Sequence, residues 1–271
     1  PIQSDPSLPI AVTPTMSPLV CIENPNIDMI IMNEGEVAIL ELCEAVEKKR
    51  SYDDVSNLVW VKDGKVKKNK LTKYMDMDKL PNQRLEFWNE KHFMKPYDGK
   101  MLMSGNFEMS RGCMHKCHYC FNRYMQIGFD KEQVGAYRRN KSIDTIIREV
   151  LEHHKKFNFE IILFSDDNFL GRSFNDMEEF YERWEKEVKI PYWINTCIET
   201  LNEENVPKLK KSNCIGIGIG METGSEWVRR NILLKGKMTN EMYVEGFKLM
   251  AKNKIRSTCN VMIGFPGEYE E

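Results

Sequence analysis

The chain has 271 residues, of which 41% are hydrophobic and 30% are charged, and its formal net charge is −2 at pH 7. This composition excludes a disordered chain and is typical of one large folded domain, or one and a half. Acidic and basic residues are interleaved, so no overall field would attract nucleic acid, and no apolar run reaches the ~18 residues of a membrane span.

No stretch of the sequence resembles a secretory signal peptide. We therefore expect a cytoplasmic location, with neither a membrane nor a nucleic acid as partner. The chain begins at Pro1 without an initiator Met and stops soon after an apolar run. We interpret it as a piece of a longer polypeptide.

The first part of the chain alternates between strand and helix signals. Short apolar runs at Pro9–Thr13 and Ile27–Met32 and a helical pattern over Glu36–Lys49 are typical of the last turns of an α/β domain. Residues Asn57–Asn69 predict a hairpin, because Asp63-Gly64 favours a two-residue turn. A linker interrupted by prolines follows at Tyr74–Lys100.

From Lys141 onward the pattern predicts repeated βα units. Helices are expected to begin after the capping residues Ser142, Ser173 and Thr239, with a weaker helix at Glu203–Lys211. Strands covered on both faces are expected at Asn106–Ser110, Glu160–Ser165, Tyr192–Cys197, Cys214–Met221 and Ser257–Phe265. Such units form a parallel sheet, either open and doubly wound or curled into a barrel, and periodicity does not choose between them.

The sequence has eight cysteines, and the lack of secretory features argues against a disulfide framework. Five are scattered in apolar surroundings, where we expect plain buried side chains. These are Cys21, Cys43, Cys197, Cys214 and Cys259. The other three, Cys113, Cys117 and Cys120, lie within eight positions in the segment RGCMHKCHYCFN.

Three kinds of metal site are compared for this loop. Zinc needs four ligands, and His115 or His118 would have to supply one, but both alternate too tightly with the cysteines to close a tetrahedron. A ferredoxin-like cluster needs a fourth cysteine, and the other thiols lie far away in sequence. Three thiolates would leave one iron of a [4Fe–4S] cube without a protein ligand, and an open position is typical of a metal that binds substrate.

The loop resembles that of the radical S-adenosylmethionine (SAM) enzymes, whose hallmark is C-x3-C-x-aromatic-C after the first strand of a barrel, with Tyr119 at the aromatic position. The resemblance extends from about Asn106 to the end of the chain. It implies an α/β fold with a partial TIM-like (β/α)6 barrel, truncated after the fifth strand. It also implies that Cys113, Cys117 and Cys120 hold a [4Fe–4S] cluster.

In that family the amino and carboxylate groups of SAM chelate the free iron, and an electron from the cluster cleaves SAM to methionine and a 5′-deoxyadenosyl radical. The radical takes a hydrogen atom from a small-molecule substrate. The resemblance also implies an electron donor such as flavodoxin or ferredoxin. The sequence does not show which residues would be catalytic.

The resemblance implies that three further segments contact SAM. Asp166 and Asp167 follow a strand where the family often has Gly-Gly-Glu to hold the methionine amino group; their proximity would raise one pKa, and helix capping or solvation is the alternative. Glu222 lies in a segment whose acidic residue binds the ribose hydroxyls, with an ion pair to Arg229 or Arg230 as the alternative. Gly264 and Gly267 would leave room for adenine, or form a plain turn.

The upstream part resembles the end of the cobalamin-binding, Rossmann-like domain found in one subset of the family. This implies three parts: 1–50 as the remnant of that domain, 51–104 as hairpin and linker, and 105–271 as an incomplete barrel. It also implies cobalamin, bound mostly outside this chain, and a methyltransferase or rearrangement reaction. A tRNA-modifying or methylthio-transferring radical enzyme and a non-catalytic iron–sulfur protein remain as alternatives.

Overall fold

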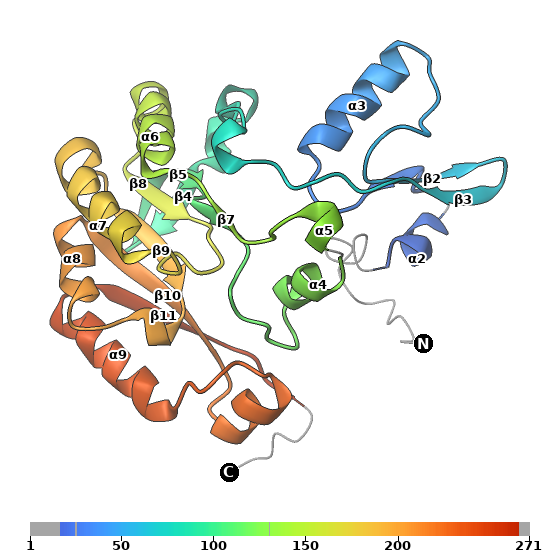
Figure 1. The fold of residues 1–271 in the computed structure, drawn as a ribbon. Coiled ribbons are helices and arrows are strands. Elements are labelled where there is room, and N and C mark those ends of the chain that lie inside the picture. The colour runs from blue at the N-terminus through green and yellow to red at the C-terminus, as the bar shows by residue number, and fades with distance from the viewer. Residues whose placement is uncertain (1–16, 25, 130, 266–271) are drawn as a thin grey trace. The chain divides into compact units, whose positions relative to one another are not determined.

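The computed structural model describes residues 17–24, 26–129 and 131–265. The chain divides into two compact units, of which unit 1 comprises residues up to 74 together with 124–137, and unit 2 comprises 75–123 and 138–271. Figure 1 shows the elements of both. The expected division into 1–50, 51–104 and 105–271 stays a prediction; by contacts the hairpin belongs to unit 1, together with the later segment 124–137.

Unit 1 contains a three-stranded sheet of order β1-β2-β3, in which neighbouring strands are antiparallel. Its elements are α2 (Pro18–Ile22), β1 (Met29–Ile31), α3 (Glu36–Glu47), β2 (Leu58–Lys62), β3 (Lys65–Lys68) and α5 (Lys131–Val134). The expected strand, helix and hairpin are confirmed, and Asp63 and Gly64 both have positive φ in the hairpin turn. The expected strand at Pro9–Thr13 lies outside the described residues.

Unit 2 is built on a six-stranded sheet of order β11-β10-β9-β8-β5-β4. The strands are β4 (Met94–Tyr97), β5 (Lys100–Phe107), β8 (Ile161–Phe164), β9 (Tyr192–Thr196), β10 (Cys214–Glu222) and β11 (Arg256–Val261). The pairs from β5 to β11 are parallel, as repeated βα units require. A small pair, β6 (Ser110–Arg111) and β7 (Arg139–Asn140), forms a separate two-stranded sheet.

Strand β4 was not expected from the sequence, which placed it in the linker Tyr74–Lys100. It is an antiparallel edge strand paired with β5, and Asp98-Gly99 forms the turn between them with positive φ at both residues. This is the same two-residue signal that predicted the hairpin of unit 1. Pro96 weakened the strand pattern in the sequence, although proline is tolerated in an edge strand.

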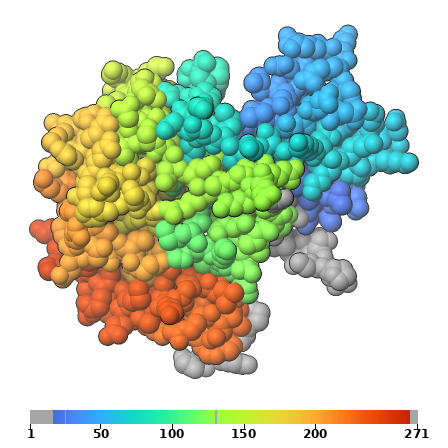
Figure 2. All heavy atoms as spheres, in the orientation of Figure 1, coloured from blue at the N-terminus to red at the C-terminus, as the bar shows by residue number. Residues whose placement is uncertain are grey.

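The sheet of unit 2 curls into a half-barrel, with its helices on the outer side (Figure 1). They are α6 (Ile143–Phe157), α7 (Phe174–Arg183), α8 (Asn205–Lys211) and α9 (Asn240–Lys252), and in Figure 2 their atoms form one outer surface. The inner face is open: Asn195 and Thr258 are exposed and Trp193 is half-buried. The expectation of strands covered on both faces is therefore wrong for β11, whose residues are mostly exposed.

Short helical turns complete the fold. They are η1 (Met77–Lys79), η2 (Leu85–Phe87), η3 (Glu90–His92), η4 (Trp184–Val188), η5 (Ile198–Thr200), η6 (Val228–Ile232) and the helix α4 (Phe121–Ile127). Among the described residues, no helix combines the length and the apolar character needed to cross a membrane.

The outer helices begin where the sequence predicts. The side chains of Ser142, Ser173 and Thr239 accept hydrogen bonds from backbone amides three residues ahead, so each cap satisfies a donor of the first turn. The weaker helix is confirmed as α8, and Pro207 lies in its first turn, where proline costs little.

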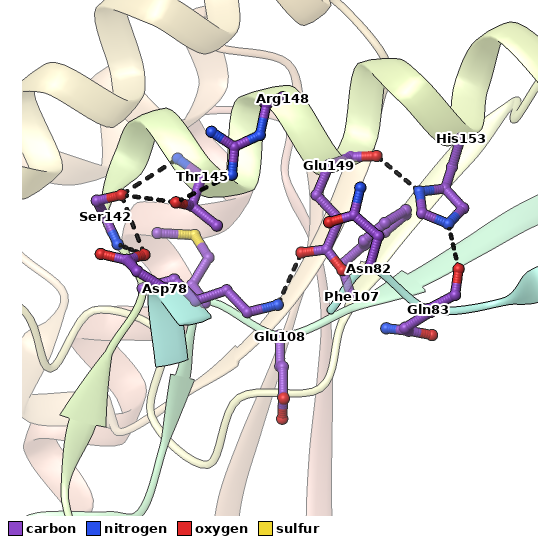
Figure 3. Close-up of polar contacts among 12 residues, drawn as sticks. Asp78, Asn82, Gln83, Phe107, Glu108, Ser142, Thr145, Arg148, Glu149 and His153 are labelled. Atoms are coloured by element: carbon purple, nitrogen blue, oxygen red, sulfur yellow. Dashed lines mark hydrogen bonds and ion pairs between the residues drawn. The ribbon is translucent and has the colours of Figure 1, made fainter. Parts of the chain in front are cut away.

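Helix α6 is also tied to the segment that precedes the sheet (Figure 3). Asp78 accepts hydrogen bonds from the amide and hydroxyl of Ser142, and His153 Nε2 lies 2.7 Å from the carbonyl oxygen of Gln83. On the same helix, Glu149 forms a 2.7 Å ion pair with Lys141, and both side chains are buried. A buried pair of this kind fixes Lys141, and with it the start of α6, against the sheet.

An aromatic cluster fills the space between the sheet and helix α7. Phe164 from β8 and Tyr192 from β9 contact Trp184, with ring centroids 5.4 and 5.2 Å away. Trp184 is fully buried, and its indole nitrogen donates to the carbonyl of Ile190 at 2.9 Å. The cluster packs the end of β8 and the start of β9 against η4.

Candidate functional site

The three clustered cysteines lie on one loop that follows β6 and ends where α4 begins. Cys113 and Cys117 are buried, at 9% and 7% exposure, and Cys120 is half-buried. Gly112 has a φ of +87°, a conformation that glycine adopts without cost, and it turns the chain immediately before Cys113. All three thiols therefore come from a single short loop at the carboxyl end of β5.

Hydrogen-bond donors surround two of these sulfurs. The amide of His115 lies 3.4 Å from Cys113 Sγ, and Asn122 Nδ2 lies 3.6 Å from Cys120 Sγ. A hydrogen bond from Cys197 and the amide of His115 lower the pKa of Cys113 to about 6, whereas burial raises the pKa of Cys117 to about 11. Thiolate is the form that binds a metal, and bound iron would stabilise it at all three positions.

Cys197 is a fourth thiol at this loop. It follows β9 directly, is half-buried, and pairs with Cys113 across a separation that the sequence could not reveal. His115 Nε2 lies 2.7 Å from Glu199 Oε1, and the ligand atoms of His115, Cys197 and Glu199 all lie within 4.8 Å of one another. The expectation of a plain buried side chain is wrong for Cys197, and also for Cys43 and Cys259, which are exposed.

The donor set fits a [4Fe–4S] cluster. Three thiols on one loop, with N–H groups directed at two of the sulfurs, match the ligation and the hydrogen bonding that iron–sulfur centres use. Cys113, Cys117 and Cys120 are the residues that would hold it. The neighbouring His115, Cys197 and Glu199 offer ligands that zinc also accepts, so the bound metal has to be measured.

Asp166 lies beneath the cysteine loop rather than beside an open site. Its side chain is 2% exposed, and its two oxygens accept hydrogen bonds from the amide of Met109, at 3.0 Å, and from the hydroxyl of Ser110. Burial raises the pKa of Asp166 to about 6, so the cause is desolvation and not the adjacent carboxylate. Both oxygens are engaged in holding the chain just before Cys113.

Arg172 and Lys141 hold the same junction from its other side. Arg172 donates to the carbonyl oxygens of Met109, at 3.1 Å, and of Lys141, at 2.8 Å. The amide of Lys141 also donates to the carbonyl of Met109. Asp167, by contrast, is exposed, so of the two adjacent carboxylates it is the one that a ligand can reach.

Glu222 occupies an unusual backbone position at the end of β10. Its φ is +72°, the register with β11 shifts between Gly220 and Glu222, and the amide of Met262 donates to its carbonyl oxygen at 2.7 Å. A bulge of this kind re-aims a side chain, and non-glycine residues with positive φ are uncommon outside constrained sites. The bulge therefore directs the Glu222 carboxylate out of the strand's regular alternation.

Glu222 does form an ion pair, but with Lys235 and not with the arginines of the alternative interpretation. Glu222 Oε1 lies 2.9 Å from the Tyr119 hydroxyl and 3.1 Å from Lys235 Nζ. Arg229 is buried elsewhere, where its guanidinium donates to the carbonyls of Thr223 and Met238 and to the side chain of Asn240. Lys235 was not predicted from the sequence, because no local pattern indicates that this lysine lies beside the cysteine loop.

The remaining predicted positions are glycines. Gly264, which follows β11, has a φ of +90°, and no atom of the described residues lies within 4 Å of a Cβ added to it. Gly267 lies outside the described residues. Gly216 and Gly218 of β10 leave room for the side chains of Trp193 and Asn195, which a Cβ at either position would strike. These side chains lie along the inner face, at a cavity of about 530 Å³ that Asn106, Ser165 and Thr258 also line.

Comparison with known proteins places this site in a family. The sequence signature of the radical SAM superfamily matches residues 107–271. The chain belongs to the radical SAM superfamily. That match covers the sheet from β8 to β11 and the whole cysteine loop, so the curled sheet is a partial radical SAM barrel, as expected.

The similar proteins include methyltransferases. An uncharacterised methyltransferase of Pyrococcus horikoshii is 24% identical over 251 residues, 92% of this chain and 51% of that protein. The cytidylyl-2-hydroxyethylphosphonate methyltransferase of Streptomyces wedmorensis is 24% identical over 249 residues, 80% of this chain and 44% of that protein. The chain thus spans about half the length of these relatives.

Two solved structures share the fold. The cobalamin-dependent SAM radical enzyme OxsB, with aqua-cobalamin and SAM bound, matches with a TM-score of 0.69 and 22% identity over 92% of this chain and 35% of that one. The radical SAM methyltransferase TsrM from Kitasatospora setae matches with a TM-score of 0.68 and 15% identity over 95% of this chain and 51% of that one. Both of these proteins share the fold of unit 2 with this chain.

Proposed function

We propose that this chain is part of a radical SAM enzyme whose [4Fe–4S] cluster is held by Cys113, Cys117 and Cys120. The observation that carries the proposal is the placement of all three thiols on one loop at the carboxyl end of β5, inside the region matched by the family. A bound cluster supplies one electron, which this family uses to cleave SAM to methionine and a 5′-deoxyadenosyl radical.

The residues around the loop are arranged to bind SAM. Glu222, at its bulge, offers a carboxylate to the two vicinal hydroxyls of the ribose. No atom of the described residues lies within 4 Å of a Cβ built at Gly264, which leaves room on that side for a flat ring such as adenine. Asp167 is exposed at the end of β8 and can accept from the methionine ammonium. Tyr119, between two cluster cysteines, fixes the orientation of Glu222 through its hydroxyl.

We further propose that the complete enzyme transfers a methyl group to a small molecule with the help of cobalamin. The support is that methyltransferases and cobalamin-dependent enzymes recur among the relatives and the structural neighbours. Substrate would enter the open inner face of the half-barrel, where the side chains of Asn106, Asn195 and Thr258 offer hydrogen bonds. An external electron donor of the flavodoxin or ferredoxin type would reduce the cluster.

One observation favours a second function, a non-catalytic iron–sulfur protein. Cys197 lies at the cysteine loop, so that four thiols are present in one region, as a closed cluster would need. In that case no iron would be left for SAM. The two functions therefore differ in one measurable property, the response of the cluster to SAM.

The decisive test is electron paramagnetic resonance of the reduced cluster with and without SAM, after anaerobic reconstitution with iron and sulfide. We expect SAM to change the spectrum, and 5′-deoxyadenosine to form after reduction with dithionite. A Glu222→Ala variant with the same iron content serves as a control and should need far more SAM for the same change. A wild-type spectrum indifferent to saturating SAM would exclude the proposed enzyme and favour the carrier.

Replacing Gly220 by alanine should weaken SAM binding with little loss of stability. A Cβ at this position would overlap the Glu222 carboxylate and lie 3.4 Å from Lys235 Nζ. Because the displaced atom is the end of a flexible side chain, the fold can adapt, but a carboxylate moved off its hydroxyl partners loses about 1–2 kcal/mol of binding, roughly tenfold in Kd.

The matched control for this substitution is Gly224→Ala, since nothing lies within 4 Å of a Cβ added there. Binding isotherms with SAM and thermal unfolding curves should be recorded for both variants. Equal SAM affinity of Gly220→Ala and Gly224→Ala would show that the placement of Glu222 does not matter for binding.

A further inference from the structure

Lys235 is a buried cation beside the cysteine loop, and the proposed function assigns it no role. Its side chain is 8% exposed, and its Nζ lies 3.1 Å from Glu222 Oε1 and 3.3 Å from the Tyr119 hydroxyl. The Nζ also lies 6.0 Å from the centre of the Tyr119 ring. Lysine is seldom buried so deeply unless it is paired, so these contacts account for its position.

The lysine joins three segments that are far apart in sequence. Tyr119 belongs to the cysteine loop, Glu222 ends β10, and Lys235 follows η6. Backbone contacts hold the same junction: the amide of His118 donates to the carbonyl of Leu233 at 2.8 Å, and the amide of Lys235 donates to the carbonyl of Arg229 at 3.0 Å. The segment that carries Lys235 is thereby fixed against the cysteine loop.

The contacts leave one oxygen of Glu222 available. Tyr119 and Lys235 both bind Oε1, and within the described residues Oε2 has no hydrogen-bond partner. Gly220 provides the space for the carboxylate, because a Cβ there would clash with Glu222 Oε1 and come into van der Waals contact with Lys235 Nζ, at 3.4 Å. A carboxylate anchored through one oxygen keeps the other in a fixed place for a ligand.

We propose that Lys235 is a positioning residue for SAM: it anchors Oε1 of Glu222 together with the Tyr119 hydroxyl, so that Oε2 is held ready to accept hydrogen bonds from the ribose. The inference rests on the proposed function. Lys235 also places a positive charge beside the cysteine loop, and such a charge stabilises the reduced form of a nearby cluster. Its loss should therefore lower both the affinity for SAM and the reduction potential of the cluster.

The experiment compares the cluster-loaded wild type with Lys235→Met, Lys235→Arg and Lys237→Met. Lys235→Met removes the charge and keeps the length of the side chain, Lys235→Arg restores the charge, and Lys237 is an exposed lysine on the same loop. Iron content should be equal in all four proteins. We expect the Kd for SAM to rise about tenfold in Lys235→Met and to recover largely in Lys235→Arg.

The midpoint potential of the cluster, measured without SAM, provides a readout that a merely structural lysine would not move. It should be lower in Lys235→Met than in the wild type and in Lys237→Met. Should Lys235→Met fail to fold, Lys235→Gln takes its place: its amide can still donate to Glu222, so the Kd for SAM should rise less, whereas the midpoint potential should fall as far because the charge is lost.

The outcomes separate this inference from the proposed function. If the wild type binds SAM and Lys235→Met, or Lys235→Gln in its place, binds it equally well, the positioning role is overturned while the proposed function stands. If the wild-type cluster does not respond to SAM at all, both are overturned. Weaker binding in Lys235→Met with recovery in Lys235→Arg and no change in Lys237→Met supports the inference.

Discussion

Replacement of Cys113, Cys117 or Cys120 by alanine, one at a time, is expected to reduce the bound iron from about four atoms per chain to near zero, since each thiolate of a [4Fe–4S] cluster holds one iron. Cys113 and Cys117 are buried, and each would hold one iron of a bound cluster, so their loss would remove ligands that solvent is poorly placed to replace. Iron and sulfide assays on anaerobically reconstituted protein, with zinc measured in the same samples, check this result.

Two other cysteines serve as controls for the same measurement. Cys43→Ala changes an exposed thiol on α3 and should leave the iron content unchanged. Cys197→Ala should also keep the full complement, because Cys197 is expected to donate a hydrogen bond to Cys113 and not to bind iron. Loss of iron in Cys197→Ala would instead identify a four-thiolate cluster, and a wild type loaded with zinc would contradict the whole assignment.

Local patterns in the sequence predicted the secondary structure well. Three of the outer helices, α6, α7 and α9, follow a serine or threonine whose side chain forms the expected cap, because a cap depends on residues only three positions apart. The parallel strands were found as short apolar runs. Strand β4 was not found, although the Asp98-Gly99 turn marked it, because Pro96 weakened the strand pattern.

The cysteine loop could be recognised because its spacing is itself a local pattern. The other parts of the site depend on contacts between residues far apart in sequence. Tyr119 forms hydrogen bonds with Glu222, 103 positions away, and with Lys235, 116 positions away. No pattern within a single segment reports such contacts. Cys197 had one usable signal, since it directly follows a strand, and in a parallel sheet the carboxyl ends of all strands lie at the same edge.

The distinction between Asp166 and Asp167 illustrates the same limit. In sequence they are equivalent carboxylates at a strand end. In the structure one lies beneath the sheet edge, where Met109 and Ser110 bind it, and the other is exposed. Which of two neighbours points inward depends on where β8 ends relative to β5, and that register is fixed only when the sheet is assembled.

Replacement of Asp166 by alanine is expected to destabilise the fold by about 3–5 kcal/mol, because it leaves the amide of Met109 and the hydroxyl of Ser110 buried without an acceptor. These two residues precede the cysteine loop, so the variant should also lose its cluster faster when challenged with an iron chelator. The matched control is Asp167→Ala, which alters an exposed side chain and should change stability by less than about 0.5 kcal/mol. Equal unfolding curves for the two variants would contradict the role given to Asp166.

The pH dependence of stability offers a sharper check on Asp166, with Asp166→Asn as a reference that does not titrate. Burial raises the pKa of Asp166 to about 6 in the folded protein, against 3.8 for an unperturbed aspartate. Between these pH values the folded chain keeps a proton that the unfolded chain releases. The free energy of unfolding of the wild type, relative to Asp166→Asn, is therefore highest below about pH 4 and falls as the pH rises through about 6. The shift corresponds to about 3 kcal/mol, which denaturant unfolding at pH 4 and pH 7 would resolve. A difference between the two proteins that stays constant would place the carboxylate in water, and one that grows with pH would mean a lowered pKa; either would contradict the burial of Asp166.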